Sequence, residues 1–231
     1  MIHLSKRLQA IADFVDTGDR VADIGTDHAF LPIALVQSGK SDYVLASDIG
    51  AGPIAIAKQN IADHGLSAKI EVRQADGLQG IRPEDDLDTV VIAGMGGELI
   101  CKILTDGQHL LDGSENLILS PHRDVDQVRQ WLADNEFGIL DETILTDEGH
   151  TYEVLVAGRT KPEVPYTPAD IAFGPVLRKK RSALFVSELQ RRQRSLQHVL
   201  AGLEVASGDI TDKQQQVQAD LQLVEAEINA D

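Results

Sequence analysis

Short apolar runs and amphipathic segments alternate along the first two thirds of the chain. Five runs have the length and composition of buried strands, over residues 20–24, 43–47, 69–74, 87–93 and 116–119. Segments with apolar side chains at helical spacing lie before, between and after them, over residues 4–15, 31–37, 52–63, 98–111 and 124–135. Two later runs, 138–145 and 152–157, are typical of an antiparallel strand pair. This alternation predicts an α/β fold with a mostly parallel sheet and helices on both faces.

The last third of the chain has a different pattern. Prolines punctuate residues 162–174, which predicts a linker between a first domain over 1–161 and a helical domain over 175–231. Residues at alternating spacings of four and three predict two long helices, over 175–205 and 211–229. The two series are Phe185, Leu189, Arg192, Leu196, Val199 and Leu203, then Val217, Leu221, Val224 and Ile228. With a turn at Ser207-Gly208-Asp209, they predict an antiparallel coiled-coil hairpin.

The charge balance limits the partners of this protein. Among 231 residues, 37 acids face 21 bases, which gives a formal net charge of −16. A protein this acidic is a poor candidate for coating nucleic acid through bulk charge. Residues 176–195 depart from the rest, because they hold seven bases and one acid. We therefore expect an acidic body with one basic region near its C-terminal end.

Absent features narrow the class of protein further. No apolar run approaches the roughly 20 residues that a membrane-spanning helix needs. The first residues lack the apolar core and cleavage site of a signal peptide. Cys101 is the single cysteine, which excludes an internal disulfide and a multi-cysteine metal site. We expect a cytoplasmic protein with no membrane segment and no metal.

Polar and glycine residues follow four predicted strands at the points where the strands end. Parallel sheets bind ligands outside these carboxyl ends, and here they carry residues 23–28, Asp48, Asp76-Gly77 and residues 94–97. The first loop contains Gly25 but lacks the second and third glycines of the GxGxxG fingerprint. That difference argues against a nicotinamide or flavin cofactor, whose pyrophosphate uses those backbone amides.

The acids at the strand ends predict a pocket that binds adenosine but has no phosphate-binding loop. A carboxylate at Asp48 is placed to accept from ribose hydroxyls, and Asp76 beside Gly77 is placed to accept from the adenine amine. S-adenosylmethionine has an adenosine, an amino-acid tail and no phosphate, so it suits this pattern. Plain turn chemistry at Asp76-Gly77 and a helix-terminal acid at Asp48 remain open as alternatives.

Several stretches of the sequence resemble one protein family closely. They are LSKRL at 4–8, ADIGTDHAFLP at 22–32, VRQADGL at 72–78, IAGMGG at 92–97, YEVLV at 152–156 and FGPVL at 173–177. These resemble the bacterial TrmK family, whose members use S-adenosylmethionine to methylate N1 of adenine 22 in tRNA. The resemblance spans nearly the whole chain. It implies a Rossmann-like methyltransferase domain followed by a coiled coil.

The resemblance also implies roles for individual residues. The residues implied to hold the cofactor are Arg7 at its carboxylate, Asp23, Gly25 and His28 at its methionine end, Asp48 at the ribose, Asp76 and Gly77 at the adenine, and Gly94 beside the methyl group. Met95 is expected next to the reactive methyl. Asp27 is the candidate for stabilising positive charge that develops on the adenine.

Contacts to the tRNA are expected from two regions. The family often has Gln-Pro-Asn after the fifth strand, whereas this chain has Ser-Pro-His, so His122 is the candidate contact to the target base. The basic region supplies candidate phosphate contacts, namely Arg178, Lys179, Lys180, Arg181 and Arg192. The alternative is that these bases pair with the acidic main domain and only dock the helical hairpin.

Two other functions remain possible from the residues alone. The acidic main domain also fits a methyltransferase for a small molecule or a protein, although the basic region opposes this reading. A non-catalytic RNA-binding protein with the same fold is the second, and the intact series of acids at the strand ends argues against it.

Overall fold

The computed structural model describes residues 2–162, 164–204 and 211–230. Two compact units divide the chain, Met1–Tyr166 and Thr167–Asp231. The boundary lies a few residues after the expected end of the first domain at residue 161. The predicted turn at Ser207-Gly208-Asp209 and the predicted helix end at Val205 lie outside the described residues.

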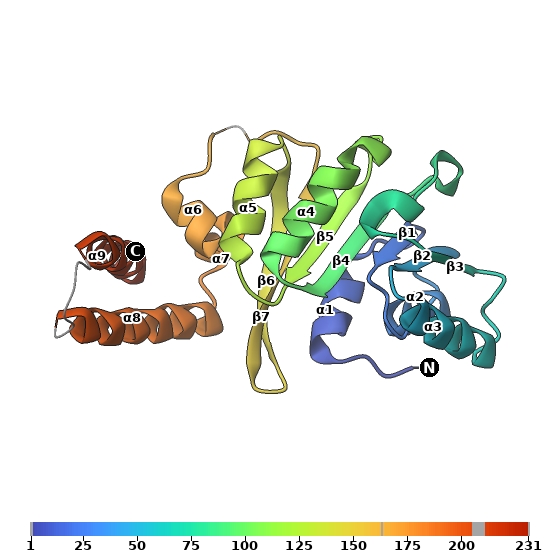
Figure 1. Cartoon of the computed structure of the whole chain (residues 1–231), viewed down its shortest axis with the longest axis horizontal. Coiled ribbons are helices and arrows are strands. Elements are labelled where there is room, and N and C mark those ends of the chain that lie inside the picture. Colours follow the sequence, from blue (N-terminus) through green and yellow to red (C-terminus); the bar gives the residue numbers. More distant parts are fainter. Residues whose placement is uncertain (1, 163, 205–210, 231) are drawn as a thin grey trace. The chain divides into compact units, whose positions relative to one another are not determined.

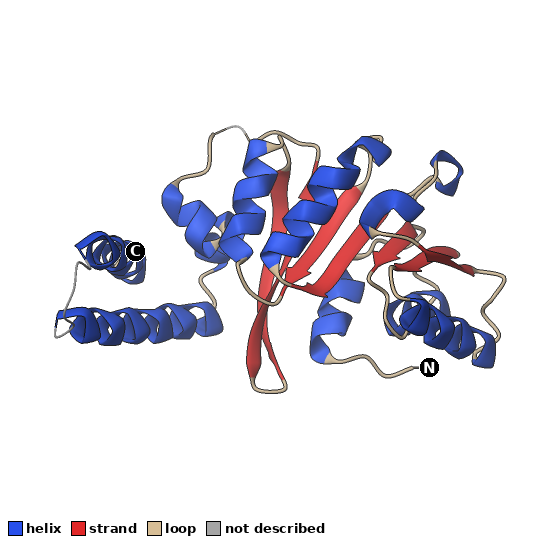
Figure 2. Cartoon of the chain, viewed as in Figure 1, coloured by secondary structure: helices blue, strands red, loops and turns tan. Residues whose placement is uncertain are grey.

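A seven-stranded sheet forms the centre of the first unit, in the order β3-β2-β1-β4-β5-β7-β6 (Figures 1 and 2). The strands are β1 (Arg20–Ile24), β2 (Tyr43–Asp48), β3 (Ile70–Gln74), β4 (Thr89–Met95), β5 (Asn116–Pro121), β6 (Gly138–Asp147) and β7 (His150–Gly158). β1 to β5 pair in parallel, and β7 runs antiparallel to both β5 and β6. The sequence-based prediction of a mostly parallel α/β sheet is confirmed.

Helices cover both faces of this sheet. They are α1 (Lys6–Phe14), α2 (Phe30–Gln37), α3 (Ala51–Asp63), α4 (Gly97–Gly107) and α5 (Val125–Asp134), with short 3-10 turns η1 (Gly77–Gly80), η2 (Pro83–Asp85) and η3 (Gln108–Leu110). Successive strand residues point to opposite faces, so Val91 packs with α1–α3 whereas Ile92 packs with α4 and α5. Two separate apolar cores result, one on each side of the sheet.

The β6–β7 hairpin is longer than the apolar pattern predicts. Both strands continue to the turn at Glu148-Gly149, and the register pairs Asp147 with His150 and Leu145 with Tyr152. β6 runs in the same direction as β5, because β7 is antiparallel to each. The hairpin turn therefore lies at the same edge of the sheet as the carboxyl ends of the parallel strands (Figure 1).

The second unit contains four helices in the described residues. They are α6 (Pro168–Phe173), α7 (Pro175–Lys180), α8 (Ala183–Glu204) and α9 (Thr211–Ile228). The expected linker over 162–174 is therefore wrong in its second half, where α6 forms. Thr167 and Asp170 make a reciprocal capping box there, and Pro168 occupies the first helical position, where its missing N–H costs nothing.

The single helix expected over 175–205 is also wrong, because Arg181 interrupts it. Arg181 has a left-handed backbone (φ 44°) between α7 and α8. Its guanidinium donates to the backbone oxygens of Glu227 and Ile228 at the end of α9. These bonds satisfy carbonyls that a helix end leaves without partners, which offsets the strained backbone.

α8 and α9 pack against each other. Phe185, Leu189 and Val224 are buried, as the predicted series of apolar positions requires. Val199, which the same series places in the seam, is 39% exposed. Val199 therefore departs from the burial that the predicted series requires.

Candidate functional site

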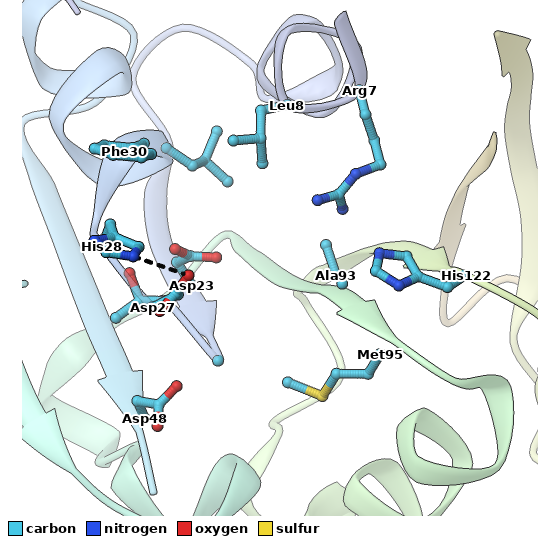
Figure 3. Close-up of a pocket in the computed structure, with 14 residues that line it drawn as sticks. Arg7, Leu8, Asp23, Asp27, His28, Phe30, Asp48, Ala93, Met95 and His122 are labelled. Atoms are coloured by element: carbon cyan, nitrogen blue, oxygen red, sulfur yellow. Dashed lines mark ion pairs between the residues drawn. The ribbon is translucent and has the colours of Figure 1, made fainter. Parts of the chain in front are cut away.

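A cavity of about 440 Å³ lies at the carboxyl ends of β1, β2 and β4 (Figure 3). Residues from five separate segments line it. It brings together most of the predicted site residues, namely Arg7, Asp23, Gly25, Asp27, His28, Asp48, Gly94, Met95 and His122. The rule that parallel sheets bind ligands at these ends thus holds in this chain.

Two groups of opposite charge, the buried carboxyl of Asp23 and the half-buried guanidinium of Arg7, line the cavity. Asp23, the fourth residue of β1, is 7% exposed, and its burial raises the pKa of the carboxyl to about 6 against the opposing effect of the Arg7 guanidinium. Arg7 reaches in from α1 toward the space between Asp23 and His122 (Figure 3). Its Nη1 is buried and has no hydrogen-bond partner within the described chain. A zwitterionic ligand would give both groups a partner.

Gly25 gives the loop after β1 a left-handed backbone, which other residues rarely adopt. Gly25 has φ +81°, and a Cβ at this position would lie 2.1 Å from Cε of Met95. The backbone N–H groups of Gly25 and Thr26 donate to the carbonyl of Ser47, which ties the loop to the end of β2. A side chain at position 25 would therefore be strained by the left-handed backbone and would displace the end of the Met95 side chain.

Asp27 and His28 lie at the mouth of the cavity. Asp27 has a left-handed backbone (φ 49°), and its carboxylate is 3.5 Å from Nε2 of His28. The imidazole stacks on the ring of Phe30, with centroids 5.3 Å apart. The side chain of Asp27 is 69% exposed, so it faces solvent at the entrance rather than the buried wall.

The predicted ribose and adenine residues separate into two cavities. Asp48 lines the main cavity, and its Oδ1 accepts from the N–H of Gly50 at 2.7 Å. Asp76 and Gly77 line a second cavity of about 150 Å³ together with Leu99 of α4. The sequence analysis does not predict this division, which arises because β3 is the edge strand and α4 packs beside its end.

His122 and Met95 form the wall on the β5 side. β4 is irregular between Ala93 and Met95, where Gly94 has φ +79°. The backbone N–H of His122 donates to the carbonyl of Met95 at 2.8 Å. Burial, aided by the positive charge of Arg7, lowers the pKa of His122. The imidazole is thus neutral at pH 7 and can donate or accept a hydrogen bond.

Sequence reasoning missed several residues of this site. Leu8, Phe30 and Leu31 line the cavity, although their helical spacing is that of core residues. Asp147 and Tyr152 contact Arg7 from the β6–β7 hairpin. No local signal could have found these two, because the contact joins segments about 140 residues apart. Among the described residues, no three His, Cys, Asp or Glu side chains gather as metal ligands.

The basic residues of the second unit fall into two groups. Arg178 pairs with Asp170 and Glu227, and Arg181 also lies 3.7 Å from Glu227. The guanidinium of Arg192 lies 5.4 Å from the ring centroid of Phe173 but remains exposed, as do Lys179 and Lys180. The first two arginines thus bind acids of their own unit and not acids of the first unit, which differs from the alternative that the sequence left open.

The fold and the site together define a class of protein. The strand order places β1 at the point where the sheet order reverses, the cavity lies there, and it offers an arginine and acids but no phosphate-binding glycine series. These are the features of a Rossmann-like, S-adenosylmethionine-dependent methyltransferase. Among the described helices, none has both the length and the apolar character needed to cross a bilayer.

Comparison with known proteins identifies the family. The model of the TrmK family, described as tRNA (adenine(22)-N(1))-methyltransferase, matches residues 21–227. The chain is 37% identical over 217 residues to the tRNA (adenine(22)-N(1))-methyltransferase of Bacillus subtilis (strain 168), covering 92% of this chain and 91% of that protein. This chain belongs to the TrmK family, as its motifs predict.

Solved structures agree with this assignment. A Streptococcus pneumoniae structure in complex with S-adenosyl-L-methionine is 36% identical, has a TM-score of 0.89 and covers 98% of this chain and 100% of that one. The structure of M. capricolum TrmK in complex with the cofactor product S-adenosyl-homocysteine is 27% identical, has a TM-score of 0.86 and covers 98% of both chains. The likeness includes both units of the chain.

Proposed function

We propose that this protein transfers a methyl group from S-adenosylmethionine to N1 of adenine 22 in tRNA, and that it does so at the main cavity. The observation that carries the site assignment is that the buried Asp23 and Arg7 line one cavity and that the buried Nη1 of Arg7 has no partner within the described chain. Membership of the TrmK family supports the substrate. A cytoplasmic location is part of the same proposal, because tRNA is modified there.

The residues of the cavity fit the cofactor. Arg7 would bind the carboxylate, and Asp23 would accept from the ammonium group, which favours the ionised form of Asp23. Gly94 leaves space at the wall, because the nearest atom to a Cβ there would be 3.9 Å away, and His28 borders the same end of the cavity. When bound, S-adenosylmethionine supplies a methyl group on a positively charged sulfur.

The adenosine part would lie across both cavities. Asp48 would accept from the ribose hydroxyls at the wall of the main cavity. Asp76 and Gly77 would hold the adenine in the second cavity, where Leu99 and Ile103 supply apolar surface. The two cavities together match a ligand with one polar and one planar apolar end.

Methyl transfer to N1 of adenine depends on the orientation of the reactants more than on proton transfer. N1 of adenine has an in-plane lone pair and no proton to lose, so a general base is not required for attack. Met95 borders the place of transfer, because its side chain lies over Gly25 inside the cavity. Holding the two reactants in line contributes several kcal/mol to lowering a barrier of this kind. Asp27, at the entrance, would stabilise the positive charge that develops on the adenine.

The target base would enter beside His122. This imidazole is held neutral and lies on the β5 side of the cavity, opposite the acids at the ends of β1 and β2. A neutral imidazole can donate to or accept from the edge of a purine. The target nucleotide must be extruded or already unstacked to reach it.

The second unit would bind the tRNA. We propose that α8 and α9 form an antiparallel coiled-coil hairpin, supported by the buried positions Leu189 and Leu221. The exposed cations Lys179, Lys180 and Arg192 are the proposed phosphate contacts. Arg178 and Arg181 would contribute by holding the helices in place, since both pair with the end of α9.

The test is methylation of unmodified tRNA with a labelled donor, followed by nucleoside analysis. We expect label in 1-methyladenosine, at one position per tRNA. A matched tRNA with guanine in place of adenine 22 should take up no label. Label at another nucleoside, or equal label in the two tRNAs, would refute the assignment.

A further inference from the structure

The β6–β7 hairpin holds α1 over the cofactor cavity. α1 carries Arg7, whose guanidinium lines the cavity. α1 comes before β1 in the sequence and is not part of the sheet. The position of its first turn therefore decides where the guanidinium of Arg7 lies. Two residues of the hairpin contact that turn or that guanidinium.

Asp147 binds the N-terminus of α1 directly. Its Oδ2 accepts from the backbone N–H of Arg7 at 3.0 Å. This bond, together with hydrogen bonds from the Ser5 hydroxyl and the Lys6 N–H, lowers the pKa of Asp147. The first N–H groups of a helix lack partners within the helix, and a carboxylate stabilises them by hydrogen bonding and by the helix dipole. Asp147 thus caps α1 from 140 residues away.

Tyr152 contacts the other end of the same residue. The guanidinium carbon of Arg7 lies 5.4 Å from the centroid of the Tyr152 ring, a cation–π distance. Asp147 pairs with His150, and Leu145 pairs with Tyr152. Directly paired residues share a face of an antiparallel hairpin, as do residues two apart. Asp147 and Tyr152 therefore project from the face that also packs Leu145 against the core containing Leu8.

The opposite face of the hairpin is held by an arginine of α5, on the other side of the sheet. Glu142 and Glu153 lie on it, and both bind the guanidinium of Arg129 in α5. Arg129 and Glu142 are fully buried, so this connection is rigid. The hairpin is thus anchored through one face while it holds α1 with the other.

We propose that Asp147 is a positioning residue for cofactor binding, which acts by fixing α1 so that Arg7 meets the ligand carboxylate, with Tyr152 supporting the guanidinium. This inference rests on the proposed function. The hairpin would thus affect ligand affinity indirectly, because none of its residues is among those that line the cavity.

The test compares two ligands in the full-length protein by calorimetry. S-adenosylhomocysteine has the amino-acid tail with its carboxylate, whereas 5′-methylthioadenosine lacks that tail. We expect Asp147→Ala to weaken binding of S-adenosylhomocysteine by about 2- to 30-fold, the fold-change equivalent to the usual cost of losing a helix cap. Affinity for 5′-methylthioadenosine should not change. Asp147→Asn, whose amide oxygen can still accept from the Arg7 N–H, should restore most of the affinity.

Two controls separate positioning from general damage. Glu148→Gln removes the neighbouring acid at the hairpin turn and should leave both affinities unchanged. In an Arg7→Ala background, Asp147→Ala should weaken binding no further, because the residue it positions is gone. An additive effect, an equal effect on both ligands, or an unchanged affinity for S-adenosylhomocysteine would overturn the inference while leaving the proposed function intact. A wild-type chain that bound neither ligand would overturn both.

Discussion

Asp23 combines a buried position with a charge that the cofactor needs. Its folded pKa of about 6 is above the ordinary value of 3.8, so the folded state favours the protonated acid. A raised folded pKa contributes stability below the ordinary pKa, and that contribution is lost as the pH rises through about 6. At neutral pH the free protein thus keeps a costly buried carboxylate for the sake of ligand binding.

We predict that Asp23→Asn stabilises the cofactor-free protein at pH 7.5 by up to about 3 kcal/mol, which corresponds to the rise of the Asp23 pKa from 3.8 to about 6. The gain should disappear near pH 4, where the wild-type carboxyl is protonated in the folded state. Urea unfolding at the two pH values measures this. The same variant should bind S-adenosylmethionine more weakly. A stability difference that does not depend on pH would contradict the burial explanation.

A second residue-scale prediction concerns Asp27. Asparagine tolerates the left-handed backbone at this position, so Asp27→Asn changes the charge without straining the loop. We expect cofactor affinity within a few-fold of wild type and a slower methyl transfer. Single-turnover kinetics with saturating cofactor provide the measurement. A normal rate would make Asp27 structural, and a collapse of cofactor binding would place it in the cofactor site instead.

At the scale of elements, the loop from β4 to α4 depends on contact between backbones. A Cβ on Gly97 would lie 2.2 Å from the carbonyl oxygen of Asp124, which precedes α5. The N–H of Gly97 also donates to the carbonyl of Arg123. Since backbone atoms cannot move aside as a flexible side chain can, this glycine sets the approach of α4 to the start of α5.

We therefore predict that Gly97→Ala destabilises the protein by about 1–3 kcal/mol, the usual cost of overpacking. Gly52 provides a matched control, because it lies in α3 and a Cβ there would meet no atom within 4 Å. Gly52→Ala should be neutral or stabilising by about 0.5 kcal/mol. Chemical denaturation of both variants makes the comparison. Equal stability of the two variants would show that α4 can move.

At the scale of the whole molecule, an acidic protein must bind a polyanion. The second unit exposes the side chains of Lys179, Lys180 and Arg192, and its less exposed Arg178 pairs with Asp170 and Glu227. Replacing the three exposed residues with alanine should weaken tRNA binding. It should also reduce the slope of log affinity against log salt by roughly 0.7–0.9 for each phosphate that the variant no longer neutralises.

Arg178→Ala is the contrasting variant. It leaves Glu227 buried without one of its partners, so we expect a lower melting temperature of the second unit and a smaller change in salt dependence. Titration of tRNA binding against salt, with thermal unfolding alongside, distinguishes the two variants. An unchanged salt slope in the triple variant would move the RNA-binding surface away from these residues.

The sequence by itself determined the order of elements, the class of fold and the main chemistry of the site. The periodicity of apolar residues is a local property, so the sequence predicts the alternation of β1 to β5 with helices. The polar residues at the ends of these strands mark one edge of the sheet. The motifs around Asp23 and Gly94 also predict membership of the TrmK family, and the comparisons confirm this membership. Asp48 and His122 lie where a parallel sheet requires, at the cavity.

Only the tertiary structure decided which distant groups meet. The break at Arg181 depends on carbonyls at the end of α9, and the division between the cavities of Asp48 and Asp76 depends on where α4 packs. The cap that Asp147 places on α1 joins segments 140 residues apart. Each of these depends on hydrogen bonds or packing between segments that are far apart in the sequence, and such pairing leaves no periodic signal along the chain.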